Sequence, residues 1–300
     1  MCAAATAAQF IPHSPFGFDR GQDVAPTFDG WVGNPDGTYS LYFGYVNRNI
    51  AEDLHIPVGP NNTVEPGGDR GQPTYFYQSG RQDPTAALGN RSVMGRRRWF
   101  AFRVDVPHTW TPQERLVWTL TSRGRTNRAV GWLQPEYEVT TEFVSDSVGD
   151  GHLFVRGDFD EANHPPTVSG AASHTVALPA TATLTITSTD DGRPQPSASP
   201  ATTRRAPPAP GLRVRWITYR GPARVAFSQA TDGPLTTSPA TFNTTATFSE
   251  PGLYWLRAKV TDGQLLATRD IEVMVNPAPS AQAGPEQSAP ALVRIQHGQR

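Results

Sequence analysis

Apolar and polar residues alternate one by one in short segments of this chain, and proline and glycine separate the segments. In 39–46 one strand face would carry four apolar residues: Tyr39, Leu41, Phe43 and Tyr45. A period of two is that of a β-strand, because successive side chains point to opposite faces of a sheet. No window shows a convincing helical stripe, and the 29 prolines and 27 glycines disfavour helix interiors. The sequence therefore predicts an all-β fold.

Chain length and strand spacing predict two antiparallel β-sandwich domains in tandem. A chain of 300 residues has room for roughly two domains. We expect an N-terminal β-sandwich over 28–145, an acidic linker over 146–165 and an Ig-like sandwich over 166–276. Proline-rich composition predicts a disordered insertion over 193–211 and a disordered tail over 277–300.

The first 27 residues carry few periodic signals, and we expect 1–27 to be a leader. The small-residue run ending in Ala7-Ala8 resembles the cleavage end of a secretory signal, without its charged and apolar parts. We expect a signal remnant whose true start lies upstream of Met1; the alternative is a flexible start of a cytosolic chain. The single cysteine, Cys2, leaves no internal disulfide. The sequence has no run of about 18 apolar residues, so no transmembrane segment is expected.

The second half of the chain carries a series of short motifs in a fixed order. They are Asn163-His164-Pro165-Pro166, Thr189-Asp190-Asp191-Gly192, Val214-Arg215-Trp216, Glu250-Pro251-Gly252-Leu253-Tyr254 and Val260-Thr261-Asp262-Gly263. In this order they resemble the polycystic-kidney-disease (PKD) type of Ig-like domain, in the variant common on bacterial secreted and surface proteins. The resemblance covers 163–276. One piece departs from it, since the W-D-F-G-D-G signature of many such repeats is replaced by Trp216-Ile217-Thr218-Tyr219.

Packing in the two domains would centre on a few aromatic residues. The resemblance places Trp216 between the sheets of the second domain. Tyr254 would hydrogen-bond back to the preceding loop, as in a tyrosine corner. In the first domain the strand pattern makes Trp118 a core residue. That domain looks like a module of uncharacterised bacterial secreted proteins, a resemblance that implies no activity.

The sequence favours a non-catalytic protein. It contains no G-x-S-x-G, H-E-x-x-H, G-x-x-x-x-G-K or G-x-G-x-x-G motif, and its seven histidines are scattered singly. A net charge of −1 argues against nucleic acid as a partner, because phosphate neutralisation needs a basic face. We predict an extracellular, periplasmic or cell-surface interaction or structural protein, not an enzyme, whose protein or polysaccharide partner is unidentified.

The alternative function is that of a carbohydrate-binding accessory protein, or the remnant of a polysaccharide-active hydrolase. Aromatic residues are dense in the first domain, and aromatic faces can carry sugar rings. The predicted ligand-binding residues are Tyr42, Tyr75 and Tyr77. Alternation puts Tyr42 on the strand face opposite Leu41 and Phe43, so it is the aromatic residue expected outside.

Calcium is the one metal that the residues suggest. Hard cations prefer clustered carboxylate and amide oxygens on turns. Just before Pro165-Pro166, at the expected domain junction, such groups come from Asp158, Asp160, Glu161 and Asn163. This stretch looks loosely similar to the calcium-binding linkers between cadherin domains. The alternative is a solvated acidic linker, and no other cofactor is expected.

Overall fold

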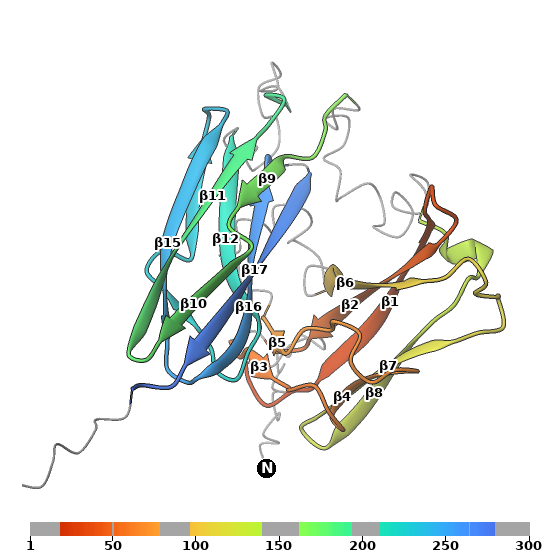
Figure 1. Ribbon diagram of the computed structural model, residues 1–300. Coiled ribbons are helices and arrows are strands. Elements are labelled where there is room, and N and C mark those ends of the chain that lie inside the picture. The colour runs from red at the N-terminus through yellow and green to blue at the C-terminus, as the bar shows by residue number, and fades with distance from the viewer. Residues whose placement is uncertain are drawn as a thin grey trace, which may run out of the picture.

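The computed structural model describes residues 19–49, 51–78, 97–139, 162–193, 211–263 and 265–279. These residues form two β-sandwiches, one from each half of the chain (Figure 1). The helical segment that they contain is the short 3-10 helix η3 (Pro135–Tyr137). The predicted all-β class with two antiparallel sandwiches is confirmed.

The N-terminal sandwich consists of two three-stranded antiparallel sheets, in the orders β1-β2-β6 and β4-β7-β8. A short pair, β3 with β5, closes one end of it. The strands are β1 (Val24–Gly33), β2 (Tyr39–Asn47), β3 (Leu54–His55), β4 (Asn62–Glu65), β5 (Tyr75–Phe76), β6 (Arg97–Val106), β7 (Leu116–Ser122) and β8 (Arg125–Gly131).

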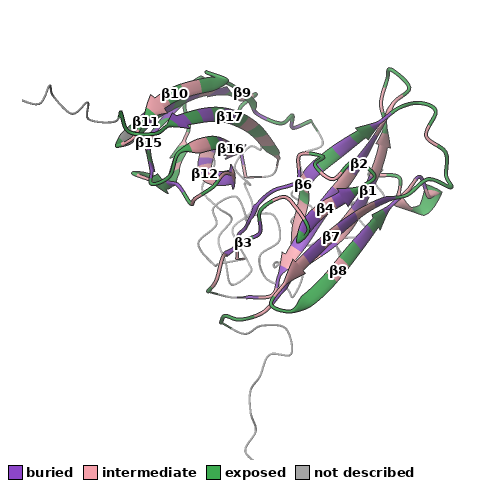
Figure 2. Cartoon of the chain, turned by 60° about the horizontal axis from the view of Figure 1, so that its bottom comes forward, coloured by how far each residue is buried: buried purple, intermediate pink, exposed green. Residues whose placement is uncertain are grey.

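Aromatic rings fill the space between these two sheets. Trp118 of β7 is fully buried and meets Phe102 of β6 edge-on, with ring centres 4.8 Å apart. Phe43 of β2 contacts both rings, stacked on Phe102 at 5.4 Å and edge-on to Trp118 at 6.2 Å. Figure 2 shows the origin of this core, since buried and exposed residues alternate along the strands. The period-two pattern of the sequence thus gives each strand one face packed in the core and one outer face.

The C-terminal sandwich has a five-stranded sheet, β10-β17-β16-β12-β14, and a four-stranded sheet, β13-β15-β11-β9. Its neighbouring strands are antiparallel except for β10 and β17, which run parallel. The strands are β9 (Thr167–Gly170), β10 (Ser173–Ala177), β11 (Ala180–Thr189), β12 (Leu212–Arg220), β13 (Ala226–Phe227), β14 (Thr231–Leu235), β15 (Ala240–Phe248), β16 (Gly252–Thr261) and β17 (Leu266–Asn276).

Two aromatic residues give this second sandwich its Ig-like character. Trp216 of β12 lies between the two sheets with 2% of its surface exposed. Tyr254, near the start of β16, is fully buried, and its hydroxyl donates a hydrogen bond to the Glu250 carbonyl at 2.8 Å. A tyrosine that ties its strand to the preceding corner in this way stabilises many Ig-like domains.

The structure departs from the sequence expectations at three kinds of place. β1 begins at Val24, so the N-terminal domain starts inside the expected leader. The alternating pattern of 136–144 predicts a strand, but η3 covers its first two residues, with Pro135 in the first helical turn, where proline is tolerated. β4, β9 and β14 were not expected, because they are short and polar and carry little alternation.

Several predicted segments lie outside the described residues. These are most of the leader, the linker up to residue 161, the insertion over 194–210 and the tail from residue 280 onward.

Candidate functional site

The three tyrosines predicted to bind a ligand lie in two different environments. Tyr42 lies half-buried on the outer face of β2, with its ring edge-on to Phe100 at 5.5 Å. Tyr75 and Tyr77 expose only 6% and 8% of their surface. The contact between the two domains covers both rings, so neither presents a face on which a sugar could stack.

Tyr77 joins the two domains through buried hydrogen bonds. Its hydroxyl donates to the Thr218 carbonyl at 2.9 Å and accepts from the Thr218 backbone N–H, also at 2.9 Å. Nearby, the Thr74 backbone N–H donates to the Tyr219 carbonyl at 3.1 Å. Tyr219 belongs to the C-terminal domain, yet it packs into the hydrophobic core of the N-terminal domain. The two cores therefore meet at β12.

Arginines surround this buried contact. Arg220 and Arg224 pair with Asp69 and Asp53 of the N-terminal domain, at 2.8 and 3.0 Å. Arg257 of β16 lies over the Tyr219 ring at 3.8 Å and donates to the Ala101 carbonyl at 2.8 Å. Polar groups at the rim and aromatic rings at the centre make this contact similar to a protein–protein interface.

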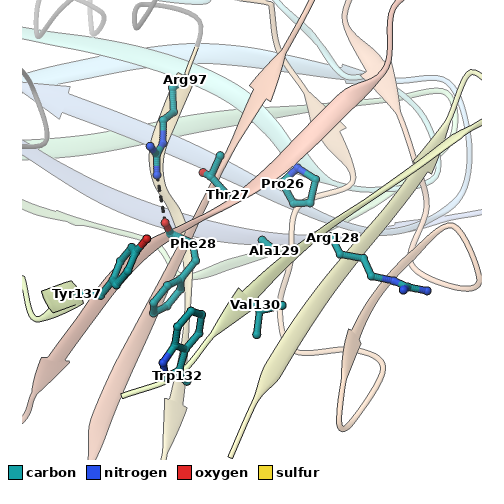
Figure 3. A pocket seen from close by; sticks show the side chains of 9 residues that line it. All are labelled: Pro26, Thr27, Phe28, Arg97, Arg128, Ala129, Val130, Trp132 and Tyr137. Carbon is teal, nitrogen blue, oxygen red and sulfur yellow. Dashed lines mark hydrogen bonds between the residues drawn. The ribbon is translucent and has the colours of Figure 1, made fainter. Parts of the chain in front are cut away.

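A surface groove among the described residues lies on the N-terminal domain, away from the contact between the two domains. It is a groove of about 290 Å³ between β1 and β8, which are edge strands of the two different sheets (Figure 3). We call it the β1/β8 groove. The residues that line it are Pro26, Thr27, Phe28, Arg97, Arg128, Ala129, Val130, Trp132 and Tyr137.

Aromatic side chains make up the floor of the β1/β8 groove. Phe28 stacks on Trp132 with ring centres 6.2 Å apart and planes 17° from parallel. Tyr137 of η3 packs against both rings, at 5.6 and 5.9 Å. Arg115 lies over the Trp132 ring at 5.0 Å. Trp132 and Tyr137 stay half-exposed, so the groove offers apolar surface beside cationic groups.

A buried ion pair fixes one wall of the groove. Asp29, which has no exposed surface, forms a salt bridge with Arg97, and the Phe100 backbone N–H donates to it at 2.7 Å. Burial raises the pKa of the Asp29 carboxyl, and the Arg97 guanidinium offsets part of that rise. Arg97 also donates to the Phe28 carbonyl at 3.2 Å and lies over the Trp99 ring at 3.4 Å. Its position is therefore set from three sides.

The residues of this groove could not be picked out from the sequence. Phe28 and Trp132 lie more than a hundred positions apart, and each sits in a pattern that reads as an ordinary strand or loop. The nearest signal in the sequence is the run of three arginines at 96–98, for which solubility is the simpler explanation. Only the approach of β1 to β8 brings these side chains together.

The predicted calcium ligands lie mostly outside the described residues. Asp158, Asp160 and Glu161 are not described, and Asn163 is buried and donates to Asp262 Oδ2 at 3.1 Å. Among the described residues, no group of three or more His, Cys, Asp or Glu side chains is arranged to hold a metal ion. Calcium binding stays a prediction. A thermal melt with and without chelator would test it, and an unchanged midpoint would overturn it.

No family model matches this chain, and no curated protein sequence is significantly similar to it. Its similarity to solved structures is low in both TM-score and sequence identity. A chimeric titin Z1Z2 has a TM-score of 0.24 and 18% identity, over 39% of this chain and 98% of that one. The PKD domain of human KIAA0319 has a TM-score of 0.21 and 18% identity, over 40% and 88%. Domains 4 and 5 of the S-layer protein SbsC have a TM-score of 0.24 and 14% identity, over 38% and 52%. None of these similarities extends a partner or an activity to this chain.

Proposed function

We propose that this chain is a non-catalytic interaction protein of the cell exterior, in which two β-sandwiches are held as one rigid body. The observation that carries this proposal is the contact between Tyr77 and Thr218. The buried Tyr77 hydroxyl forms hydrogen bonds with both the carbonyl and the backbone N–H of Thr218 in the other domain. Domains that merely follow one another in a chain need no such contact, and relative motion is their default behaviour. A fixed arrangement suits a protein that presents surfaces at a set spacing.

The second domain is, in this proposal, an Ig-like module of PKD type that supports the first. Its motifs and its tyrosine corner favour that assignment. The extracellular, periplasmic or surface location rests on the small-residue run near the N-terminus and on this resemblance. In the described ranges, no helix is long and apolar enough to cross a membrane.

Three measurements test this first proposal. Small-angle scattering should fit one rigid two-domain shape, fractionation of the source cells should find the protein outside the cytoplasm, and incubation with polysaccharides should release no reducing ends. A flexible ensemble, a cytoplasmic location or the appearance of reducing ends would each overturn the corresponding part of the proposal.

A second candidate function is carbohydrate binding, and the β1/β8 groove favours it. Three aromatic residues line this groove, all of them partly exposed, and ligand pockets are commonly built from such apolar surface with a few polar groups. A glycan array tests it directly. Binding that Trp132→Ala weakens is expected; an array without any binding would leave the interaction role to a protein partner.

A further inference from the structure

The β1/β8 groove is lined by cations and by no carboxylate. Arg97 stands on the β6 side of the Phe28 ring and Arg128 on the β8 side (Figure 3). Arg128 is exposed and forms no ion pair with a described residue. The charge of Arg97 is balanced by Asp29, whereas that of Arg115, above Trp132, adds to the local excess. The chain as a whole carries a net charge of −1, so this positive character is local.

We propose that the β1/β8 groove binds an acidic polysaccharide, that is, a glycan strand with carboxylate or sulfate groups. The guanidinium of Arg128 would receive the anionic group, since its planar fork matches carboxylate and other oxyanions. Neighbouring sugars would pack against the parts of the Trp132 and Tyr137 rings that Phe28 and Arg115 leave exposed. This inference names the ligand class of the second candidate function and rests on it.

An acidic peptide is the main competitor for these cations, and the edge of β1 argues against it. A peptide recognised by an edge strand adds to the sheet through backbone hydrogen bonds. Pro26 lies on this stretch of β1 and has no N–H to donate. Farther along β1, the Val139 backbone N–H already donates to the Trp31 carbonyl at 2.8 Å. The exposed surface that remains consists of rings and guanidinium groups, which suits a sugar strand.

The test measures binding of the full chain to polygalacturonate, to heparin and to neutral dextran by calorimetry. Binding to one or both acidic polymers is expected, and which of the two binds identifies carboxylate or sulfate as the recognised group. Arg128→Ala should weaken binding about tenfold, the usual effect of losing one charge-assisted hydrogen bond. The matched control is Arg125→Ala, an exposed arginine on the same strand that does not line the groove.

Four outcomes would overturn the proposal. They are no binding to either acidic polymer, equal binding to dextran, equal weakening by Arg125→Ala and Arg128→Ala, and full displacement of the glycan by polyglutamate. Equal binding to dextran would leave the carbohydrate-binding function itself intact. Absence of binding to every glycan would end both. Arg128→Glu, at an exposed position where folding should be unaffected, serves as a second variant and should abolish binding.

Discussion

Gly44 shows how one residue without a side chain lets three strands share a polar contact. It lies in β2, between the Asp29 carboxylate from β1 and the backbone of β6. A Cβ here would overlap both Asp29 Oδ2 and the Arg98 carbonyl oxygen. The space that Gly44 leaves lets Asp29 cross β2 and hold Phe100, whose φ of 50° is unfavourable for a residue with a side chain. The wall of the groove depends on this position.

Gly44→Ala is therefore expected to destabilise the protein by about 1–3 kcal/mol, the usual cost of forcing atoms into a packed site. Urea unfolding measures the change. Gly33→Ala is the control, because a Cβ at Gly33 in β1 would meet nothing within 4 Å. If both variants were equally stable, the packing around Asp29 would be looser than described.

Buried tyrosine hydroxyls predict a loss of stability in alkali. Burial raises the pKa of Tyr219 from 10.0 to about 12, and burial raises that of Tyr75 to about 12 as well. Above pH 10.0 the unfolded chain ionises these groups while the folded protein keeps their protons. The contribution of these two hydroxyls to the free energy of unfolding should thus be constant below that pH and fall as pH rises toward about 12. Urea titrations across this range measure it, and Tyr219→Phe should show a smaller fall.

At the scale of elements, Asn62 links three segments that share little regular structure. Its side-chain amide donates to the Ile56 and Pro73 carbonyls at 2.9 and 2.8 Å. Its carbonyl oxygen accepts from Trp118 Nε1 at 2.9 Å. The long polar stretch between β2 and β6 thus owes part of its order to a side chain in β4. Buried side-chain hydrogen bonds hold this stretch in place, whereas longer strands are held by the burial of their alternating apolar residues.

Asn62→Leu should cost about 3 kcal/mol or more, since each buried polar group left without a partner costs about 1–3 kcal/mol. Chemical unfolding followed by tryptophan fluorescence measures both stability and the environment of Trp118. Thr63→Leu, a partly exposed neighbour on the same strand, is the comparison. A cost below that of Thr63→Leu would contradict the linking role of Asn62.

At the scale of the whole molecule, the contact between the two sandwiches is the feature that couples their stability. Aromatic residues at its centre and ion pairs at its rim couple β12 to the segment around Tyr77. Because Tyr219 packs into the core of the other domain, disrupting one sandwich disturbs the other. The protein should consequently unfold as a single unit.

Calorimetry should show one transition for the natural protein. Tyr77→Phe leaves both backbone groups of Thr218 without their partner, so we expect a loss of about 1–3 kcal/mol. Tyr77→Ala, which also removes the ring, should separate the transition into two. Tyr42→Phe is the control, since no hydrogen bond of the Tyr42 hydroxyl is found among the described residues. Two transitions in the natural protein would show that the domains are independent.

The sequence by itself determined the all-β class, the two tandem sandwiches and the buried places of Trp118, Trp216 and Tyr254. The class and the place of Trp118 follow from alternation within single strands, whereas those of Trp216 and Tyr254 follow from the ordered motifs that resemble a PKD-type domain. Short polar strands such as β4 could not be predicted, because side-chain hydrogen bonds to residues distant in the sequence hold them in place.

Only the tertiary structure decided where the surfaces lie. Tyr75 and Tyr77 are aromatic residues of the kind that form a binding surface, yet the second domain packs against them and buries them. Phe28 and Trp132 read as ordinary strand and loop residues, yet the approach of β1 and β8 makes them the floor of a groove. Exposure depends on which distant segments meet, and alternation within one strand carries no information about that.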